Sequence, residues 1–297
     1  MRLYIIGNGF DLNHGLPTSY WNYRNYLLQV NPALVGDYEF GEYFRAIEGS
    51  PNTRWNDLEA GLELLYDNAF EDVVHTYYPD MNSERTPGWD DINVEIENRF
   101  SFLRSFTGKY FYQWISSIEN YFPNVVPKYV LSQEDAYVTF NYTRTLEVVY
   151  GIPNERVLHL HGLAEKAGSI QFGNPSNVPE DIQGELERTY SNDEFYNVVL
   201  EPAISAMARF ADSAYKNILS NVTELTLFLR DLQKVDEIVI MGHTMMGVDY
   251  PYYRNVFIPT FRNALWTIYV FNEAAVEEAT RFVSSSQLTN YHFTSWM

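Results

Sequence analysis

Short apolar runs rich in β-branched and aromatic residues recur along the chain, and most of them end in polar residues or glycine. Five of these runs predict buried strands, at 2–8, 136–142, 156–162, 237–243 and 265–271; 169–174 is a weaker candidate and 290–296 a candidate edge strand. The runs do not alternate cleanly between apolar and polar residues, which is typical of strands covered on both faces in a parallel sheet. The pattern therefore predicts an α/β fold.

Residues between the first two predicted strands follow a helical pattern instead. Ser19 is a candidate cap for a helix that starts at Tyr20, and apolar residues at positions 55, 58, 62, 65, 66 and 69 have nearly helical spacing. The pattern resumes from Asn93 to Pro123 after a polar loop at 79–91. We therefore predict a Rossmann-like, doubly wound, mostly parallel sheet over 1–30 and 131–297, with a helical insertion subdomain over 31–130.

A second long insertion, 164–195, follows the third predicted strand. Long loops near the carboxyl ends of parallel strands can close over a ligand. The sequence leaves two interpretations open, a lid over a site and a surface excursion.

Composition narrows the classes of function. The chain has 20 basic and 39 acidic residues, a net charge of −19, so broad binding to nucleic acid is not expected. It contains no cysteine, which excludes disulfides, a thiol nucleophile and a cysteine-ligated zinc site. The sequence shows no leader-like start and no apolar run approaching 18 residues, so we expect a cytoplasmic protein without a membrane partner.

Candidate chemistry gathers where the predicted strands end. The first strand runs into Gly7-Asn8-Gly9, a turn that either approaches a dinucleotide or simply joins a strand to a helix; Leu12 stands where the third glycine of a dinucleotide fingerprint would be. Later strands end in Asn141, in His159 and His161, and in His243 with Asp249 nearby. Because the carboxyl ends of parallel strands meet at one edge, we expect these groups to form a ligand site.

Two families share these motifs. The segment GNGFDLNHGLP at 7–17 is similar to the phosphate loop of sirtuins, while TFNYT at 139–143 and HLHG at 159–162 resemble their Asn-containing and His-Gly motifs. The combination of GNGFD, HGLPTSY, WNDLE, FNYTRTLE, HLHG and GHTMMGVDY resembles more closely the AbiH family of phage abortive-infection proteins.

The resemblance implies a phage-defence protein that binds and hydrolyses NAD or a related nucleotide. Asn141 would orient the attacking water and His161 would act as the base. The expected ligand-binding residues are Gly7, Asn8, Gly9, Phe10, Asp11, His14, Pro17, Gly242, His243, Thr244 and Asp249, with the phosphates on the 7–11 loop. The expected partners are a small-molecule nucleotide and either a second copy of the chain or a phage-derived trigger.

The sequence departs from sirtuins at Phe140 and Thr143, which replace a glutamine and an aspartate, so the nucleotide need not be NAD. Two other functions stay open: a non-catalytic nucleotide-sensing module, and a metal-dependent hydrolase. The hydrolase would use His159, His161 and His243 with Asp11 or Asp249, because residues two apart on a strand share a face. The first two hypotheses need no metal.

The WNDLE segment, with Trp55, Asp57 and Glu59, has two interpretations. Glu59 is either a solvated charge or cap on an amphipathic helix, or a carboxylate that reaches the ligand cleft.

Overall fold

The computed structural model describes residues 1–47, 53–79, 88–164, 168 and 170–296. The chain divides into two compact units. The sheet unit comprises Met1–Asn22, Tyr112–Gln171 and Asn217–Met297, and the helical unit comprises Tyr23–Phe111 and Phe172–Lys216. The helical unit therefore combines most of the predicted insertion with a segment that follows the third strand.

The sheet unit is built on six parallel strands in the order β3-β2-β1-β4-β5-β6. Their bounds are β1 Arg2–Ile6, β2 Ala136–Thr139, β3 Val157–His159, β4 Glu237–Met241, β5 Leu265–Val270 and β6 Tyr291–Ser295. The chain moves outward from β1 to β2 and β3, then returns to place β4 on the other side of β1. The predicted Rossmann-like fold is confirmed, and its switch in strand order lies between β1 and β4.

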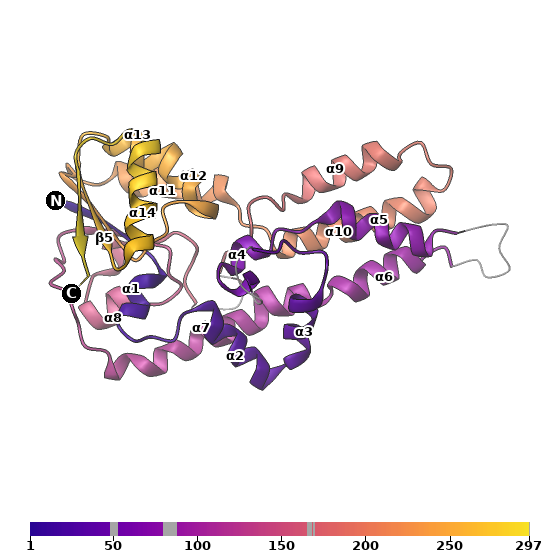
Figure 1. Cartoon of the computed structure of the whole chain (residues 1–297), viewed down its shortest axis with the longest axis horizontal. Helices are drawn as coiled ribbons and strands as arrows, with labels where there is room; N and C mark the ends of the chain where they lie inside the picture. Colours follow the sequence, from indigo (N-terminus) through magenta and orange to yellow (C-terminus); the bar gives the residue numbers. More distant parts are fainter. Residues whose placement is uncertain (48–52, 80–87, 165–167, 169, 297) are drawn as a thin grey trace. The chain divides into compact units, whose positions relative to one another are not determined.

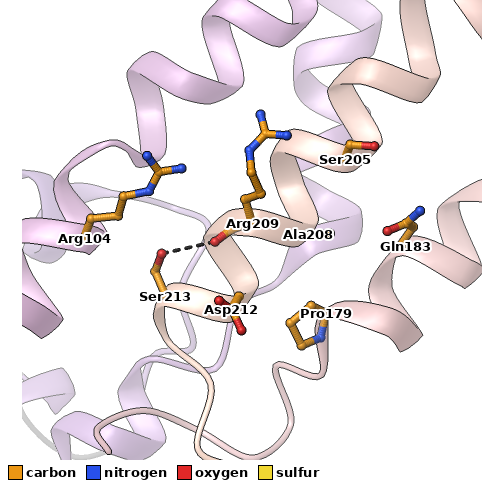
Figure 2. A pocket seen from close by; sticks show the side chains of 8 residues that line it. All are labelled: Arg104, Pro179, Gln183, Ser205, Ala208, Arg209, Asp212 and Ser213. Atoms are coloured by element: carbon orange, nitrogen blue, oxygen red, sulfur yellow. Dashed lines mark hydrogen bonds between the residues drawn. The ribbon is translucent and has the colours of Figure 1, made fainter. Parts of the chain in front are cut away.

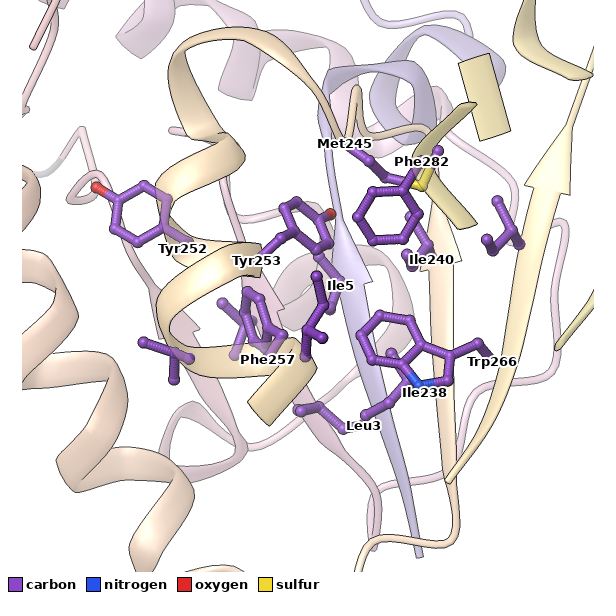
Figure 3. Close-up of a cluster of buried hydrophobic side chains, with 14 of the residues drawn as sticks. Leu3, Ile5, Ile238, Ile240, Met245, Tyr252, Tyr253, Phe257, Trp266 and Phe282 are labelled. Carbon is purple, nitrogen blue, oxygen red and sulfur yellow. The ribbon is translucent and has the colours of Figure 1, made fainter. Parts of the chain in front are cut away.

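Side chains on both faces of the sheet are buried. Along β1, Leu3 and Ile5 pack into one apolar cluster, while Tyr4 and Ile6 pack into another on the opposite face. The first cluster also takes in Trp266 and other large side chains, which Figure 3 shows filling the space between the strands and neighbouring helices. Burial on both faces explains why the strand sequences lack an apolar–polar alternation.

Helices cover the two faces of the sheet. Those that belong wholly to the sheet unit are α1 Asn8–Asn13, α8 Thr145–Tyr150, α11 Ile218–Arg230, α12 Tyr250–Tyr252, α13 Ile258–Phe261 and α14 Glu273–Ser285. In Figure 1, α11 to α14 lie together on one side of the strands, and α1 and α8 lie on the other. Among the described residues no helix is both long and apolar enough to cross a bilayer.

The helical unit holds α3 Pro32–Phe40, α4 Leu58–Gly61, α5 Tyr66–Tyr77, α6 Asp91–Phe100, α9 Pro179–Tyr190 and α10 Glu201–Ser213. Two helices, α2 Tyr20–Val30 and α7 Phe111–Ile118, begin in one unit and continue into the other. Figure 1 shows α9 running beside α10. The core of this unit is aromatic: Tyr23 is fully buried and its ring lies 5.5 Å from that of Phe106, while Tyr38 lies 5.1 Å from Trp55.

Several predicted boundaries are corrected. Strands β2 and β3 end three residues earlier than predicted, at Thr139 and His159. The weak candidate at 169–174 is not a strand over its described residues, since only Asn174 forms an isolated bridge, with Tyr215. The insertion at 164–195 is not a structureless loop, because it contains α9. Most of the polar loop predicted at 79–91 lies outside the described residues.

The helix cap predicted at Ser19 is present. The hydroxyl of Ser19 accepts a hydrogen bond from the backbone N–H of Asn22 at 3.2 Å, and α2 begins at Tyr20.

Candidate functional site

The glycine turn after β1 packs against the loop after β4. A β-carbon on Gly7 would lie 2.5 Å from the Cα of His243, and one on Gly9 would lie 2.8 Å from the Cα of Gly242. The Gly9 N–H donates to the carbonyl of Gly242 at 2.8 Å. The glycines are therefore required by the close approach of two loops at the point where the strand order reverses.

Asn141, just beyond β2, lies at the same glycine turn. Its side-chain Nδ2 donates to the carbonyl of Gly7 at 3.1 Å, and the residue is 7% exposed. Its Oδ1 is buried and has no hydrogen-bond partner among the described residues. A buried amide oxygen without a donor is costly, so it is a position where a water or a ligand N–H or O–H would be stabilised.

Asp11 places a second acceptor near this position. It lies on α1 and is almost completely buried, and Thr143 donates a hydrogen bond to its Oδ2. Burial raises the pKa of Asp11 to about 6, although the hydroxyl of Thr143 and other hydrogen bonds partly oppose this shift. Its Oδ1 also lacks a donor among the described residues. Two buried side-chain oxygens at this position, Oδ1 of Asn141 and Oδ1 of Asp11, are therefore available as hydrogen-bond acceptors.

His161 and His243 lie on either side of one carboxylate. The Nε2 of His161 is 3.4 Å from Oδ1 of Asp249, and the Nε2 of His243 is 3.4 Å from Oδ2 of the same residue. The ring of Phe140 lies beside both imidazoles, with centroids 5.0 Å from His161 and 3.9 Å from His243. His243 also borders Gly7, so predicted residues that follow β2 and β4 meet at the glycine turn, and His161 lies beside Asp249 and Phe140.

Two other histidines, His159 and His14, hydrogen-bond to neighbouring residues of the sheet unit. The Nε2 of His159 is 2.7 Å from Oε1 of Glu147, and its Nδ1 faces the carbonyl of Asn141 at 3.2 Å. His14 uses both ring nitrogens, on the carbonyl of Phe10 and the hydroxyl of Tyr150. Burial lowers the pKa of His14, which favours a neutral ring.

The expectation that His159 and His161 share a face is wrong, because β3 ends at His159 and the chain turns before His161. His159 pairs with Glu147 on α8, whereas His161 faces Asp249. Within the described ranges no group of three or more histidine, aspartate or glutamate side chains is arranged to hold a metal ion.

Residues 3–270 of the 297-residue chain match the family described as bacteriophage abortive infection AbiH. The chain belongs to the AbiH family. Neither a curated protein nor a solved structure matches it. The AbiH resemblance stated from the motifs is confirmed, and the family is one of phage abortive infection.

The remaining predicted ligand residues of this AbiH protein differ in burial and in their contacts. Asn8 donates through Nδ2 to the carbonyl of Thr18 at 2.9 Å, and Phe10 is fully buried in the apolar cluster that contains Tyr4 and Ile6. Pro17 is partly exposed and Thr244 is exposed.

Two neighbours of the site, Thr143 and Tyr253, are not marked as such by the sequence. Thr143 was seen only as a departure from the sirtuin motif, yet it is the donor to Asp11. Tyr253 places its hydroxyl 2.9 Å from Nδ1 of His243. With 24 tyrosines in the chain, nothing in the sequence distinguishes this one.

Three side chains of the WNDLE segment of the AbiH motif set make contacts inside the helical unit. Trp55 is buried and donates to Glu39, and Asp57 caps α4 by accepting from the N–H of Ala60. Glu59 is neither solvated nor a cap, because it is 5% exposed and forms an ion pair with the fully buried Lys216. All of these contacts lie within the helical unit.

The helical unit has an open pocket of about 520 Å³ beside α10, shown in Figure 2. Arg104 and Arg209 line it, but so does Asp212, and Arg209 is already paired with Glu97 at 2.7 Å. The four charges cancel, so this pocket offers no net attraction for an anion. The carboxyl edge of the sheet is the better candidate site.

Proposed function

We propose that this AbiH protein binds NAD or a related nucleotide at the carboxyl edge of its sheet and hydrolyses it during phage abortive infection. The observation that carries the proposal is the side chain of Asn141, which is bonded to the carbonyl of Gly7 while its buried Oδ1 lacks a donor among the described residues. Ligands of open α/β sheets bind at this switch point.

The acceptors favour one orientation of the proposed nucleotide at the turn. Oδ1 of Asn141 and Oδ1 of Asp11 need donors, and ribose hydroxyls supply them. The turn has few free donors for phosphate, because the N–H groups of Gly7, Gly9 and Phe10 all bond to backbone carbonyls. We therefore place a ribose, rather than a phosphate, beside Asp11.

The same groups suit cleavage of an N-glycosidic bond. A positively charged nicotinamide leaves as a neutral molecule and needs no proton, so the enzyme has to position water and stabilise an oxocarbenium-like sugar. Asn141 would orient the water, and His161 would accept its proton. The carboxylates of Asp11 and Asp249 would stabilise positive charge that develops on the sugar.

The test is incubation of the purified full chain with NAD, with and without lysate of phage-infected cells, while nicotinamide release is measured. Asn141→Ala and His161→Ala should abolish release, whereas Asn120→Ala, at an exposed asparagine, should leave it unchanged. Absence of turnover by the unaltered chain under every condition would overturn the enzymatic proposal.

One observation favours a second candidate, a non-catalytic nucleotide sensor. His161 and Asn141 are only 2% and 7% exposed, so the two side chains assigned to the water have little contact with solvent. A sensor would bind NAD tightly without releasing nicotinamide, and it would lose binding when Gly9 is replaced by leucine. Isothermal titration calorimetry beside the release assay separates the two functions.

A further inference from the structure

Strand β6, Tyr291–Ser295, forms one edge of the sheet. Within the described part of the chain its single neighbour in the sheet is β5, and no strand lies beyond it. The backbone groups of such an edge can pair with a strand of another chain. The opposite edge is less suited to pairing, because β3 has only three residues, Val157–His159.

The register of β6 determines which of its backbone groups point outward. The carbonyl of Asn290 accepts a hydrogen bond from the N–H of Trp266 at 2.9 Å, and the N–H of Trp296 donates to the carbonyl of Val270 at 3.2 Å. In a parallel pair, residues whose N–H and C=O both face the neighbouring strand alternate with residues whose groups face away. The groups that face the open side of β6 therefore belong to Tyr291, Phe293 and Ser295.

Aromatic packing holds β6 in place on the sheet. Phe293 packs against the apolar cluster around Trp266. Near the end of the strand, the ring of Trp296 lies 5.8 Å from that of Tyr129 and 5.7 Å from that of Tyr269. A strand that is already fixed in this way loses little conformational entropy when it pairs with another chain.

The edge lacks the residues that usually prevent pairing. Residues 282–297 contain no Asp, Glu, Lys or Arg, although these types make up 20% of the chain. Charged residues, lysine above all, and proline commonly protect an exposed edge, and β6 contains neither. Two copies with a net charge of −19 each repel one another at long range, so they meet most favourably at a neutral surface. A basic partner would instead be attracted to an acidic surface.

We infer that β6 pairs with β6 of a second copy of the chain, in the antiparallel direction, about a two-fold axis at Phe293. In this register Phe293 lies opposite the partner's Phe293, and Tyr291 lies opposite the partner's Ser295. Residues that face outward then meet one another, so every outward N–H and C=O has a hydrogen-bond partner. A register shifted along the strand leaves some of these groups unpaired.

The pairing ends at a dimer. A two-fold axis uses the same edge of both copies, so the contact does not propagate. Strands of the two copies run in opposite directions across the axis, which places the two carboxyl edges on opposite sides of the combined sheet. Neither candidate site then needs a residue from the other copy. The inference is therefore independent of the proposed nucleotide hydrolysis.

The experiment measures the mass of the full chain by sedimentation over a range of concentrations. The unaltered chain should form dimers. Tyr291→Lys with Ser295→Lys sets lysine opposite lysine at both outer pairs and should give monomers, whereas Tyr291→Lys with Ser295→Glu sets lysine opposite glutamate and should restore the dimer. Both variants change the same two exposed side chains, and circular dichroism checks that each is folded.

Single cysteines give a second readout, because the chain has no cysteine of its own. Phe293→Cys places two thiols opposite one another at the axis, with Cα atoms about 5.5 Å apart, and should form a linked dimer under mild oxidation. Tyr291→Cys is the matched control, because its two thiols would lie roughly 13 Å apart along the strands and should not link.

Three results would overturn the inference. They are an unaltered chain that stays monomeric, a lysine–lysine variant that stays dimeric, and a lysine–glutamate variant that stays monomeric. A chain that is monomeric alone but pairs through β6 with a different protein would also overturn it, in favour of a foreign strand. Linked dimers of Phe293→Cys, without linked dimers of Tyr291→Cys, would support both the pairing and its register.

Discussion

Gly9 lies directly against Gly242, with the N–H of Gly9 bonded to the carbonyl of Gly242 at 2.8 Å. The contact joins the turn after β1 to the loop after β4, and it brings His243 to the edge of the glycine turn. The two loops come this close because neither residue has a β-carbon. A sequence motif that resembles a phosphate-binding loop therefore has a packing role of its own.

Gly242→Ala should destabilise the sheet unit strongly. Gly242 has φ of +66°, and an added β-carbon would lie 2.2 Å from the backbone nitrogen of Phe10. Gly247→Ala is the matched control, since Gly247 has φ of +86° and nothing within 4 Å of the added carbon. Both changes carry the backbone cost of roughly 1–2 kcal/mol, but Gly242→Ala should cost about 1–3 kcal/mol more. Urea denaturation of both variants measures the difference, and equal costs would contradict it.

Asn141→Asp should destabilise the fold and abolish turnover. The change removes the donor to Gly7 and places an acceptor against its buried carbonyl, at an expected cost of about 1–3 kcal/mol. Asn120→Asp also removes a hydrogen bond from a side-chain amide to a backbone carbonyl, but at an exposed position. It should cost no more than about 0.5 kcal/mol. Thermal unfolding distinguishes the variants. A cost equal to that of Asn120→Asp would argue against a tightly held Asn141.

Asp11→Asn should make the protein more stable above pH 6. The pKa of Asp11 is raised from 3.8 in the unfolded chain to about 6 in the fold, so the folded state binds its proton more tightly. The contribution of Asp11 to the free energy of unfolding is therefore greatest at low pH. It falls by roughly 3 kcal/mol in all as the pH rises through 3.8 to 6.

The asparagine variant does not titrate at this position. Its advantage over the unaltered chain in free energy of unfolding should be largest at pH 7 to 8 and shrink toward pH 4. Asp231→Asn, at an exposed residue, should show no such trend. A difference that does not vary with pH would show that Asp11 does not titrate in this range.

Lys216→Met should unfold much of the helical unit. Lys216 is fully buried, and its loss leaves the carboxylate of Glu59 buried without its ion-pair partner, which costs about 3–5 kcal/mol. The double variant Glu59→Gln with Lys216→Met should recover part of that stability, because neither member of the ion pair then carries a charge. Circular dichroism during urea denaturation compares the two. A single variant that is more stable than the double variant would contradict this account.

The sheet was predictable because its strands are buried on both faces. Runs such as Arg2–Ile6 and Leu265–Val270 are continuous, apolar and bounded by polar residues, and the structure places strands there. Their ends were harder to predict. The N–H of Phe140 still donates to the carbonyl of Ile6, but the N–H of Asn141 donates to the hydroxyl of Thr139. The apolar run after β2 therefore continues in the sequence although the backbone has already left the sheet.

Local signals for α9 were present in the sequence. The helix starts with Pro179 followed by Glu180 and Asp181, and its buried residues Ile182 and Leu186 are four apart. Contacts between distant segments left no such signal. Nothing near Glu59 indicates that Lys216 neutralises it, and nothing near His161 indicates that Asp249 faces it.

The position of β1 between β2 and β4 has a consequence for synthesis of the chain. Arg2 pairs with Glu237, which is 235 positions later in the sequence, so the middle of the sheet closes only when nearly the whole chain is available. Closing so long a loop carries an entropic cost and slows folding. Gly242, His243 and Asp249 all lie beyond that point, so a nascent or truncated chain that ends before β4 cannot assemble the site. The proposed activity is therefore confined to chains that extend beyond β4 and through Asp249.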